Sequence, residues 1–299
     1  MKDSARRYSK LPNSRLLPAA RFGDLIIGRL LLIGLGLLFL QLFLHGLCYS
    51  LGVTGLLSKG LTTRFWAAAM SSPALRQSLQ LSALIASAVT AISLSGSLLI
   101  TLLRYHSGSS RLIESALWLA MAVPVVVAAT LTRFWLAPGG LIARLLYHCG
   151  LLESPASFPA LINDPCSIGI ILCGTCCSMP LLTLFQLRIQ EADGLHRYVR
   201  TAVQLGASRW QAFLHVLLPM LLQRSRGMLA LTFLWNFSAW EAPLLLGQQS
   251  PRMISVLIQK SSGEFSLDQR PLGFVYSTVY FIVGVLTIAA FAGKAARRE

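Results

Sequence analysis

Three cysteines stand close together in the sequence, and cysteine thiolates bind zinc and react in redox sites. Cys173, Cys176 and Cys177 form a CxxCC pattern inside one apolar stretch. A zinc site normally draws paired ligands from two separated segments, and no His or second Cys pair stands at suitable spacing. Cysteine is also a small apolar residue suited to close helix packing. The pattern therefore favours packing, and we expect neither a metal site nor a cofactor.

One carboxylate, Glu241, stands well inside an apolar stretch that begins at Gly227. If that stretch is a membrane helix, an unpaired charge near its centre costs about 2.5–3.5 kcal/mol, so the side chain should face protein or water. At about 1.5 Å per residue, Glu241 lies roughly 20 Å along the helix. We expect it to line the outward part of a pathway, with Pro243 opening the backbone beside it. The alternative is a carboxylate that reaches the outer interface or pairs with a neighbouring helix.

The elements that would position these residues are long apolar segments. The chain is 55% hydrophobic and 12% charged, which is about half the charged share of a soluble domain. A helix needs about 20 apolar residues to cross a bilayer. Such segments lie at 30–58, 77–103, 115–132, 166–186, from 227 with an interruption at Glu241, and at 272–293. The sequence predicts an all-α membrane protein with about six transmembrane helices. We expect a basic tail (1–29), a single transmembrane domain (30–293) and a short tail (294–299), since no linker divides the chain.

The basic residues predict the orientation of these helices. Of the 26 Lys and Arg residues, 18 lie in the amino-terminal tail, the loop near His106, the 188–226 loop and the carboxyl-terminal tail. Lys and Arg accumulate on the cytoplasmic side of membranes, so both termini should be cytoplasmic. The first apolar run is too long for a cleaved signal. The net charge of +15 does not indicate nucleic-acid binding, because the basic residues sit at the ends of apolar runs, where they set topology and contact lipid headgroups.

The 188–226 loop has the pattern of a helix pair. Ser208 and Gln211 form a capping box that should start a helix. One apolar face follows at helical spacing, and Pro219 should end the helix; the face comprises Trp210, Phe213, Leu214 and Leu217. Residues 198–205 can form a shorter helix, and Gly206 can take the turn between the two. Such a pair could dock onto another protein, or it could rest on lipid headgroups as an interfacial hairpin.

The spacing in this loop resembles the "EAA" loop of permease subunits in binding-protein-dependent type I ABC importers. The matching positions are Leu205, Gly206, Ala207, Ser208, Phe213, Leu218 and Pro219. One element departs from the family pattern: Arg200, Thr201 and Ala202 stand where the family has Glu-Ala-Ala, so the acidic residue has become basic. The resemblance implies that this loop, with Arg200 and Ala202, docks an ATPase.

A second segment is similar to the family's fifth helix. It runs from Phe237 to Gly247 and contains Glu241 and Pro243. The residues from Met253 and from Arg270 onward resemble the branch that imports polyamines, ferric iron or thiamine, and the similarity covers 77–293. By this resemblance, Glu241, Pro243 and Gly247 lie on the translocation pathway.

The resemblance also implies partners. Two permease subunits form the path in a bacterial cytoplasmic membrane, each docks one ABC ATPase subunit, and a substrate-binding protein delivers the solute. The chain has no GxxxxGK[ST] phosphate loop, so it should not itself be an enzyme, and ATP hydrolysis belongs to the separate subunit. Arg200 favours a non-identical second permease with a more typical loop.

Two other classes of protein fit less well. A secondary transporter usually carries several ionisable or broken-helix elements in repeated halves, and the sequence shows one carboxylate and no internal repeat. A membrane-embedded enzyme would cluster His, Asp or Glu near one interface. The sequence leaves the transported substrate open.

Overall fold

The computed structural model describes residues 17–55, 60–107, 111–263 and 269–296, and every regular element in these ranges is helical. This confirms the all-α prediction. The elements are α1 (Leu17–Ser50), α2 (Arg64–Ser71), α3 (Pro73–Ser107), α4 (Arg111–Met121), α5 (Val125–Leu136), α6 (Leu141–His148), the 3-10 turn η1 (Pro155–Ser157), α7 (Ile168–Ala192), α8 (Leu195–Gln204), α9 (Arg209–Ala212), the π-helix η2 (Phe213–Leu217), α10 (Leu218–Arg224), α11 (Arg226–Phe237), α12 (Glu241–Leu246), α13 (Ile254–Gly263) and α14 (Arg270–Ala296).

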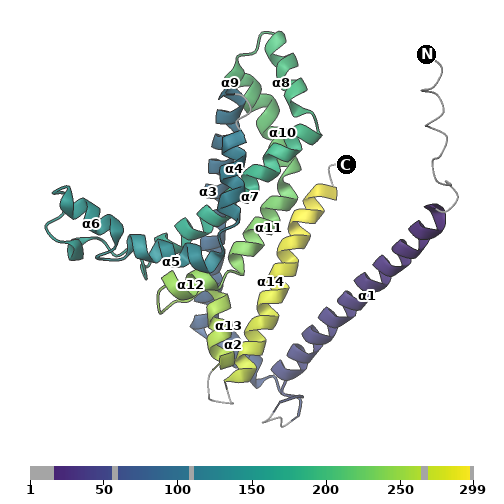
Figure 1. Ribbon diagram of the computed structural model, residues 1–299. Helices are drawn as coiled ribbons and strands as arrows, with labels where there is room; N and C mark the ends of the chain where they lie inside the picture. Colours follow the sequence, from purple (N-terminus) through teal and green to yellow (C-terminus); the bar gives the residue numbers. More distant parts are fainter. Residues whose placement is uncertain (1–16, 56–59, 108–110, 264–268, 297–299) are drawn as a thin grey trace, which may run out of the picture.

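Five stretches within these ranges are long and apolar enough to cross a membrane: 27–50, 73–104, 125–148, 168–192 and 270–290. The segment expected at 115–132 is not one helix. Pro124 has no N–H and is itself extended, and proline disfavours the helical region for the residue before it, so α4 ends at Met121 and α5 begins at Val125. Figure 1 shows α5 turning away from α4 toward α6, which forms an arm at the side of the bundle.

The expected helix that runs from Gly227 through Glu241 is wrong, because the chain breaks before Glu241. α11 ends at Phe237, and α12 begins at Glu241 after a short break. α11 has 12 residues and α12 has 6, so each is shorter than the roughly 20 residues of a membrane span.

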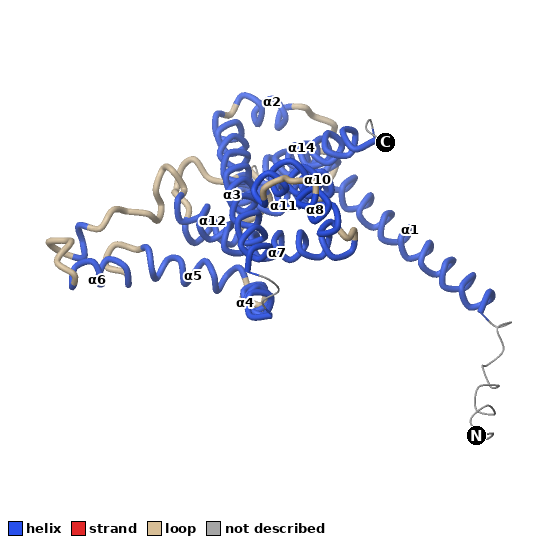
Figure 2. The backbone as a smooth tube through the Cα atoms, turned by 90° about the horizontal axis from the view of Figure 1, so that it is seen from above, coloured by secondary structure: helices blue, strands red, loops and turns tan. Residues whose placement is uncertain are grey.

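The centre of the bundle is the parallel pair α3 and α7, with α11 beside both (Figures 1 and 2). Glycines allow the close approach: a Cβ on Gly96 would lie 2.5 Å from the Met179 sulfur, and one on Gly174 would lie 2.9 Å from the Asn236 side-chain oxygen. Asn236 donates a hydrogen bond from Nδ2 to Ser178 Oγ at 2.9 Å. A buried polar contact therefore holds α11 against α7.

Near its carboxyl-terminal end α1 contacts α14, and Ser50 accepts a hydrogen bond from Trp66 Nε1 of α2 at 3.2 Å. The ring centroids of Phe43 and Phe281 lie 4.7 Å apart, and those of Tyr49 and Phe274 lie 4.3 Å apart. Figure 1 shows the rest of α1 diverging from the bundle, with its first turn and the last turn of α14 directed toward the end that carries α8 and α9. Residues 1–16 and 297–299 of the predicted tails lie outside the described residues.

Candidate functional site

The predicted helix pair is present, and we call residues 193–218 the hairpin. Its first helix, α8, is longer than expected because it starts at Leu195 instead of residue 198. Gly206 forms the turn with a φ of +97°, a conformation that L side chains rarely adopt. The Gly206 N–H bonds to Val203 O at 3.0 Å, and the Ala207 N–H bonds to Ala202 O at 3.1 Å. These bonds satisfy carbonyls that the end of α8 would otherwise leave unpaired.

The predicted capping box starts the second helix. The Gln211 N–H donates to Ser208 Oγ at 3.2 Å, and the Ser208 N–H donates to Gln211 Oε1 at 2.9 Å. Two amide donors at the start of α9 are thereby satisfied reciprocally. The prediction of a helix start at Ser208 is confirmed.

The predicted end of this helix at Pro219 is wrong. Residues 213–217 widen into a π-helix in which the Leu218 N–H bonds to Phe213 O, and α10 continues to Arg224. Pro219 stands in the first turn of α10, where a missing N–H breaks no intrahelical bond. The π turn therefore lets the helix pass the proline.

The π turn also divides the expected apolar face. Phe213 and Leu217 are buried, whereas Trp210 is 54% and Leu214 36% exposed. The buried pair belongs to one cluster with Leu195, Val199, Ala212 and Leu221. Partly buried side chains of α3, α7 and α8 pack against this cluster: Leu98, Leu102, Ile189 and Ala202. The sequence interpretation missed Leu195 and Val199, although their i, i+4 spacing gave a helical signal.

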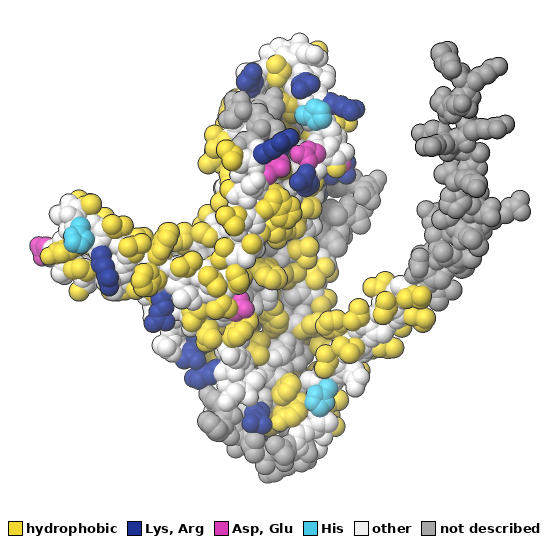
Figure 3. All heavy atoms as spheres, viewed as in Figure 1, with side chains coloured by type: hydrophobic (Ala, Val, Ile, Leu, Met, Phe, Trp, Pro, Cys, Tyr) yellow, Lys and Arg dark blue, Asp and Glu magenta, His cyan; other side chains and the backbone are white. Residues whose placement is uncertain are grey.

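The tip of the hairpin is apolar and exposed. Leu205 is 83% exposed beside Gly206, and Tyr198 and Trp210 are also exposed. Three exposed arginines lie on α8 and α9 and have no ion pair among the described residues: Arg197, Arg200 and Arg209. Figure 3 shows Lys and Arg gathered over this end of the molecule, with hydrophobic side chains over the middle.

The base of the hairpin is held by ion pairs. Arg188 and Arg104 lie 2.8 Å and 3.5 Å from the Glu191 carboxylate, and Arg224 lies 3.2 Å from Asp193. Arg188, Arg104 and Arg224 are thus paired with carboxylates of this chain.

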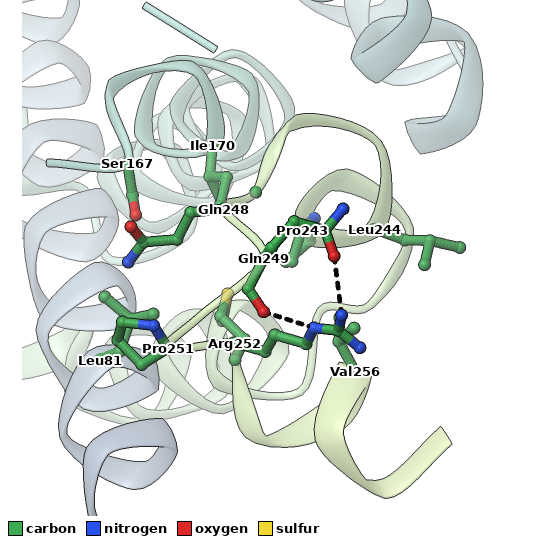
Figure 4. Close-up of a pocket in the computed structure, with 12 residues that line it drawn as sticks. Leu81, Ser167, Ile170, Pro243, Leu244, Gln248, Gln249, Pro251, Arg252 and Val256 are labelled. Carbon is green, nitrogen blue, oxygen red and sulfur yellow. Dashed lines mark hydrogen bonds between the residues drawn. The ribbon is translucent and has the colours of Figure 1, made fainter. Parts of the chain in front are cut away.

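The three residues predicted for the pathway, Glu241, Pro243 and Gly247, do not all line the same cavity. Pro243 and Gly247 line a cavity of about 120 Å³, at the end of α7 opposite the hairpin, which we call the α12–α13 pocket (Figure 4). A Cβ on Gly247 would collide with the Pro243 carbonyl oxygen, so a larger residue would require the backbone to shift. Glu241 is half-buried at the start of α12 and does not line this pocket.

A larger hollow of about 670 Å³ lies between α7, α11 and α14. Its walls are mainly apolar and include Cys177, Trp235 and Phe281. Cys173, one helical turn before Cys177, is fully buried in the core with Ile85 and Val89.

No protein-family model and no curated protein sequence matches the chain. A chain of a bacterial alginate ABC transporter, crystallised in complex with an alginate pentasaccharide-bound periplasmic protein, superposes with a TM-score of 0.72 over 92% of this chain and 95% of its own. The chain has the ABC importer permease fold. A chain of a bacterial ABC transporter involved in the import of the acidic polysaccharide alginate gives 0.67 over 95% and 99%. Each is 14% identical to this chain, and the polyamine, ferric iron or thiamine branch stays a prediction.

Proposed function

We propose that this chain is the membrane-spanning subunit of an ATP-driven importer in a bacterial cytoplasmic membrane. It forms half of a translocation path with a second, non-identical permease subunit and receives its solute from a substrate-binding protein. The exposed tip of the hairpin, on a chain with this fold, carries the proposal. Arg200, Ala202, Leu205 to Ser208, Phe213 and Pro219 belong to the segment that docks the ATPase, and both termini lie on that cytoplasmic side.

The hairpin can pass motion to the transmembrane helices. Phe213 and Leu217 belong to a buried cluster against which Leu98 and Leu102 of α3 and Ile189 of α7 also pack. Packed side chains resist compression, so force on the tip displaces the ends of α3 and α7. Closure of the ATPase would thereby rock the helices between inward-open and outward-open states.

The tip favours a protein partner with an acidic rim around an apolar socket. Leu205 and Trp210 supply the apolar centre, and the unpaired arginines supply positive charge at its edge. Complementary charge at an interface rim increases association rates and selects partners. Figures 1 and 2 show α8 projecting beyond the bundle along its long axis. A helix resting on lipid lies in the plane of the interface instead.

The test is co-purification of the tagged full-length chain from its own cells in lipid nanodiscs. Leu205→Asp should reduce the recovered ATPase at least ten-fold, because a carboxylate would enter the apolar socket. Leu61→Asp is the matched control: Leu61 is 77% exposed and shortly precedes α2, which Figure 1 shows at the end of the bundle opposite α8. Equal ATPase recovery with both variants, or no ATPase with the unaltered chain, would contradict the proposal. Binding of the hairpin variants to liposomes would then distinguish the lipid alternative.

The secondary-transporter alternative makes a different prediction. Uptake would follow an ion gradient and continue without ATP. Uptake into proteoliposomes that stops when the ATPase is omitted supports the importer.

A further inference from the structure

The α12–α13 pocket differs from the rest of the bundle in its polar lining. Ser167, Gln248, Gln249 and Arg252 line it together with apolar side chains from α3, α7, α12 and α13. No acidic side chain is among the 12 residues that line it. Its volume of about 120 Å³ is enough for a group of a few heavy atoms.

Ser167 carries a buried hydroxyl with no hydrogen-bond partner among the described residues. The residue is 2% exposed. It stands at the N-cap of α7, where a serine usually accepts a backbone hydrogen bond. Here Asp164 takes that role, because both of its oxygens lie 3.1 Å from the Ile168 N–H. The Ser167 side chain is therefore left free at the pocket wall, and Figure 4 shows it directed toward Gln248.

The backbone of Ser167 is also unusual. Its φ of +55° and ψ of +34° place a non-glycine residue in the left-handed region. Such strain persists where surrounding structure imposes it, and it concentrates at binding sites. The conformation and the free hydroxyl are separate observations at one wall of the pocket.

Arg252 supplies positive charge at the opposite wall. Its Nε donates to Gln249 O and its Nη2 to Gln249 Oε1, both at 2.7 Å, which fixes the guanidinium (Figure 4). A guanidinium has five N–H donors, so three remain for a ligand. Arg252 forms no ion pair within the described part of the chain.

We propose that the α12–α13 pocket binds an oxyanion through Arg252, Ser167 and Gln248. Amide and hydroxyl groups can donate to anionic oxygen, and arginine forms charge-assisted bonds with carboxylate, phosphate and related groups. The ligand is a small inorganic oxyanion or a carboxylate on a larger solute. The inference deepens the proposed function, because Pro243 and Gly247, which line the pocket, are the residues assigned to the solute path.

The binding test uses the purified full-length chain in nanodiscs of uncharged lipid, without the ATPase. Sodium sulfate and sodium acetate are titrated against sodium chloride at constant ionic strength, and the unfolding temperature is followed. Binding to the folded state raises this temperature saturably. Sulfate represents the inorganic oxyanion and acetate the carboxylate, so the anion with the lower half-saturating concentration identifies the source.

Variants separate the pocket from general salt effects. We expect Arg252→Gln to increase the half-saturating concentration at least ten-fold and Ser167→Ala to increase it several-fold. Arg64→Gln, an exposed arginine on α2 outside the pocket, should match the unaltered chain. If Arg252→Gln does not fold, Ser167→Ala and Gln248→Ala provide the test. A linear, non-saturating rise, or equal behaviour of all variants, would overturn the site while leaving ATPase docking unaffected.

Discussion

The guanidinium of Arg104 lies 2.7 Å from the Glu114 carboxylate and joins α3 to α4 at the hairpin end of the bundle. The two side chains are only 13% and 25% exposed. We expect Arg104→Gln to destabilise the chain by about 1–3 kcal/mol, because a largely buried carboxylate loses a charged hydrogen-bond partner. The unfolding temperature in nanodiscs measures this loss.

The control for this ion pair is Arg111→Gln on α4, because Arg111 is exposed and has no ion pair among the described residues. It should change the unfolding temperature little. The double variant Arg104→Gln/Glu114→Gln should recover part of the stability, since no charge is then left unpaired. The double variant is compared with the single variants Arg104→Gln and Glu114→Gln. If the losses of stability in these two single variants simply add in the double variant, the ion pair does not stabilise the contact between α3 and α4.

Gly206 and Gly227 form a matched pair for testing the hairpin turn. A Cβ on either residue would meet nothing within 4 Å, but only Gly206 has a positive φ. We expect Gly206→Ala to destabilise the turn by about 1–2 kcal/mol through backbone strain. Gly227→Ala, within α11, should be neutral or stabilising by up to about 1 kcal/mol. Hydrogen exchange over residues 200–212, with ATPase recovery, measures the effect; equal exchange in both variants would contradict it.

The capping box at Ser208 can be tested locally. Ser208→Ala removes the acceptor of the Gln211 N–H and should destabilise the start of α9 by about 1 kcal/mol. Amide exchange at residues 209–212 should accelerate about five-fold, because about 1.4 kcal/mol corresponds to ten-fold in an equilibrium constant. Ser208→Asp keeps an acceptor and should exchange like the unaltered chain. Protection unchanged in Ser208→Ala would show that packing alone holds α9.

The hairpin shows how far sequence reasoning reaches. The Ser208 cap and the Gly206 turn depend on interactions between near neighbours in the chain, so their residue types suffice to predict them. The π turn at 213–217 lies in a cluster that includes side chains of α3, α7 and α8, and helical spacing contains no information on such distant contacts. The regular 3.6-residue period therefore placed Trp210 and Leu214 on the wrong face.

The α12–α13 pocket was predictable only in part. The resemblance of the 237–247 segment to the permease family predicted Pro243 and Gly247 as pathway residues. Ser167 and Arg252 are 85 residues apart in the sequence and share no motif, so the sequence did not predict that they line one pocket. Both line one pocket because α12 packs against α7 while α13 packs against α3. The expected path residue Glu241 lies outside the pocket, because the chain turns between Phe237 and Glu241 and begins a new helix.

The contact of α7 with α3 and α11 gives the last prediction. A Cβ on Gly174 would lie 2.9 Å from Asn236 Oδ1 and 3.1 Å from a Val89 methyl carbon, and both neighbours are buried. We expect Gly174→Ala to destabilise the chain by about 1–3 kcal/mol through overpacking. Asn236 would also be displaced from its hydrogen bond to Ser178.

The matched control is Gly284→Ala on α14, where a Cβ would meet nothing within 4 Å. Because alanine favours a helix over glycine, this variant should be neutral or stabilising by up to about 1 kcal/mol. Unfolding temperatures in the same nanodiscs compare the two variants. If Gly174→Ala were as stable as Gly284→Ala, α11 could move away from α7 at little cost. The Asn236–Ser178 bond would then not fix their spacing.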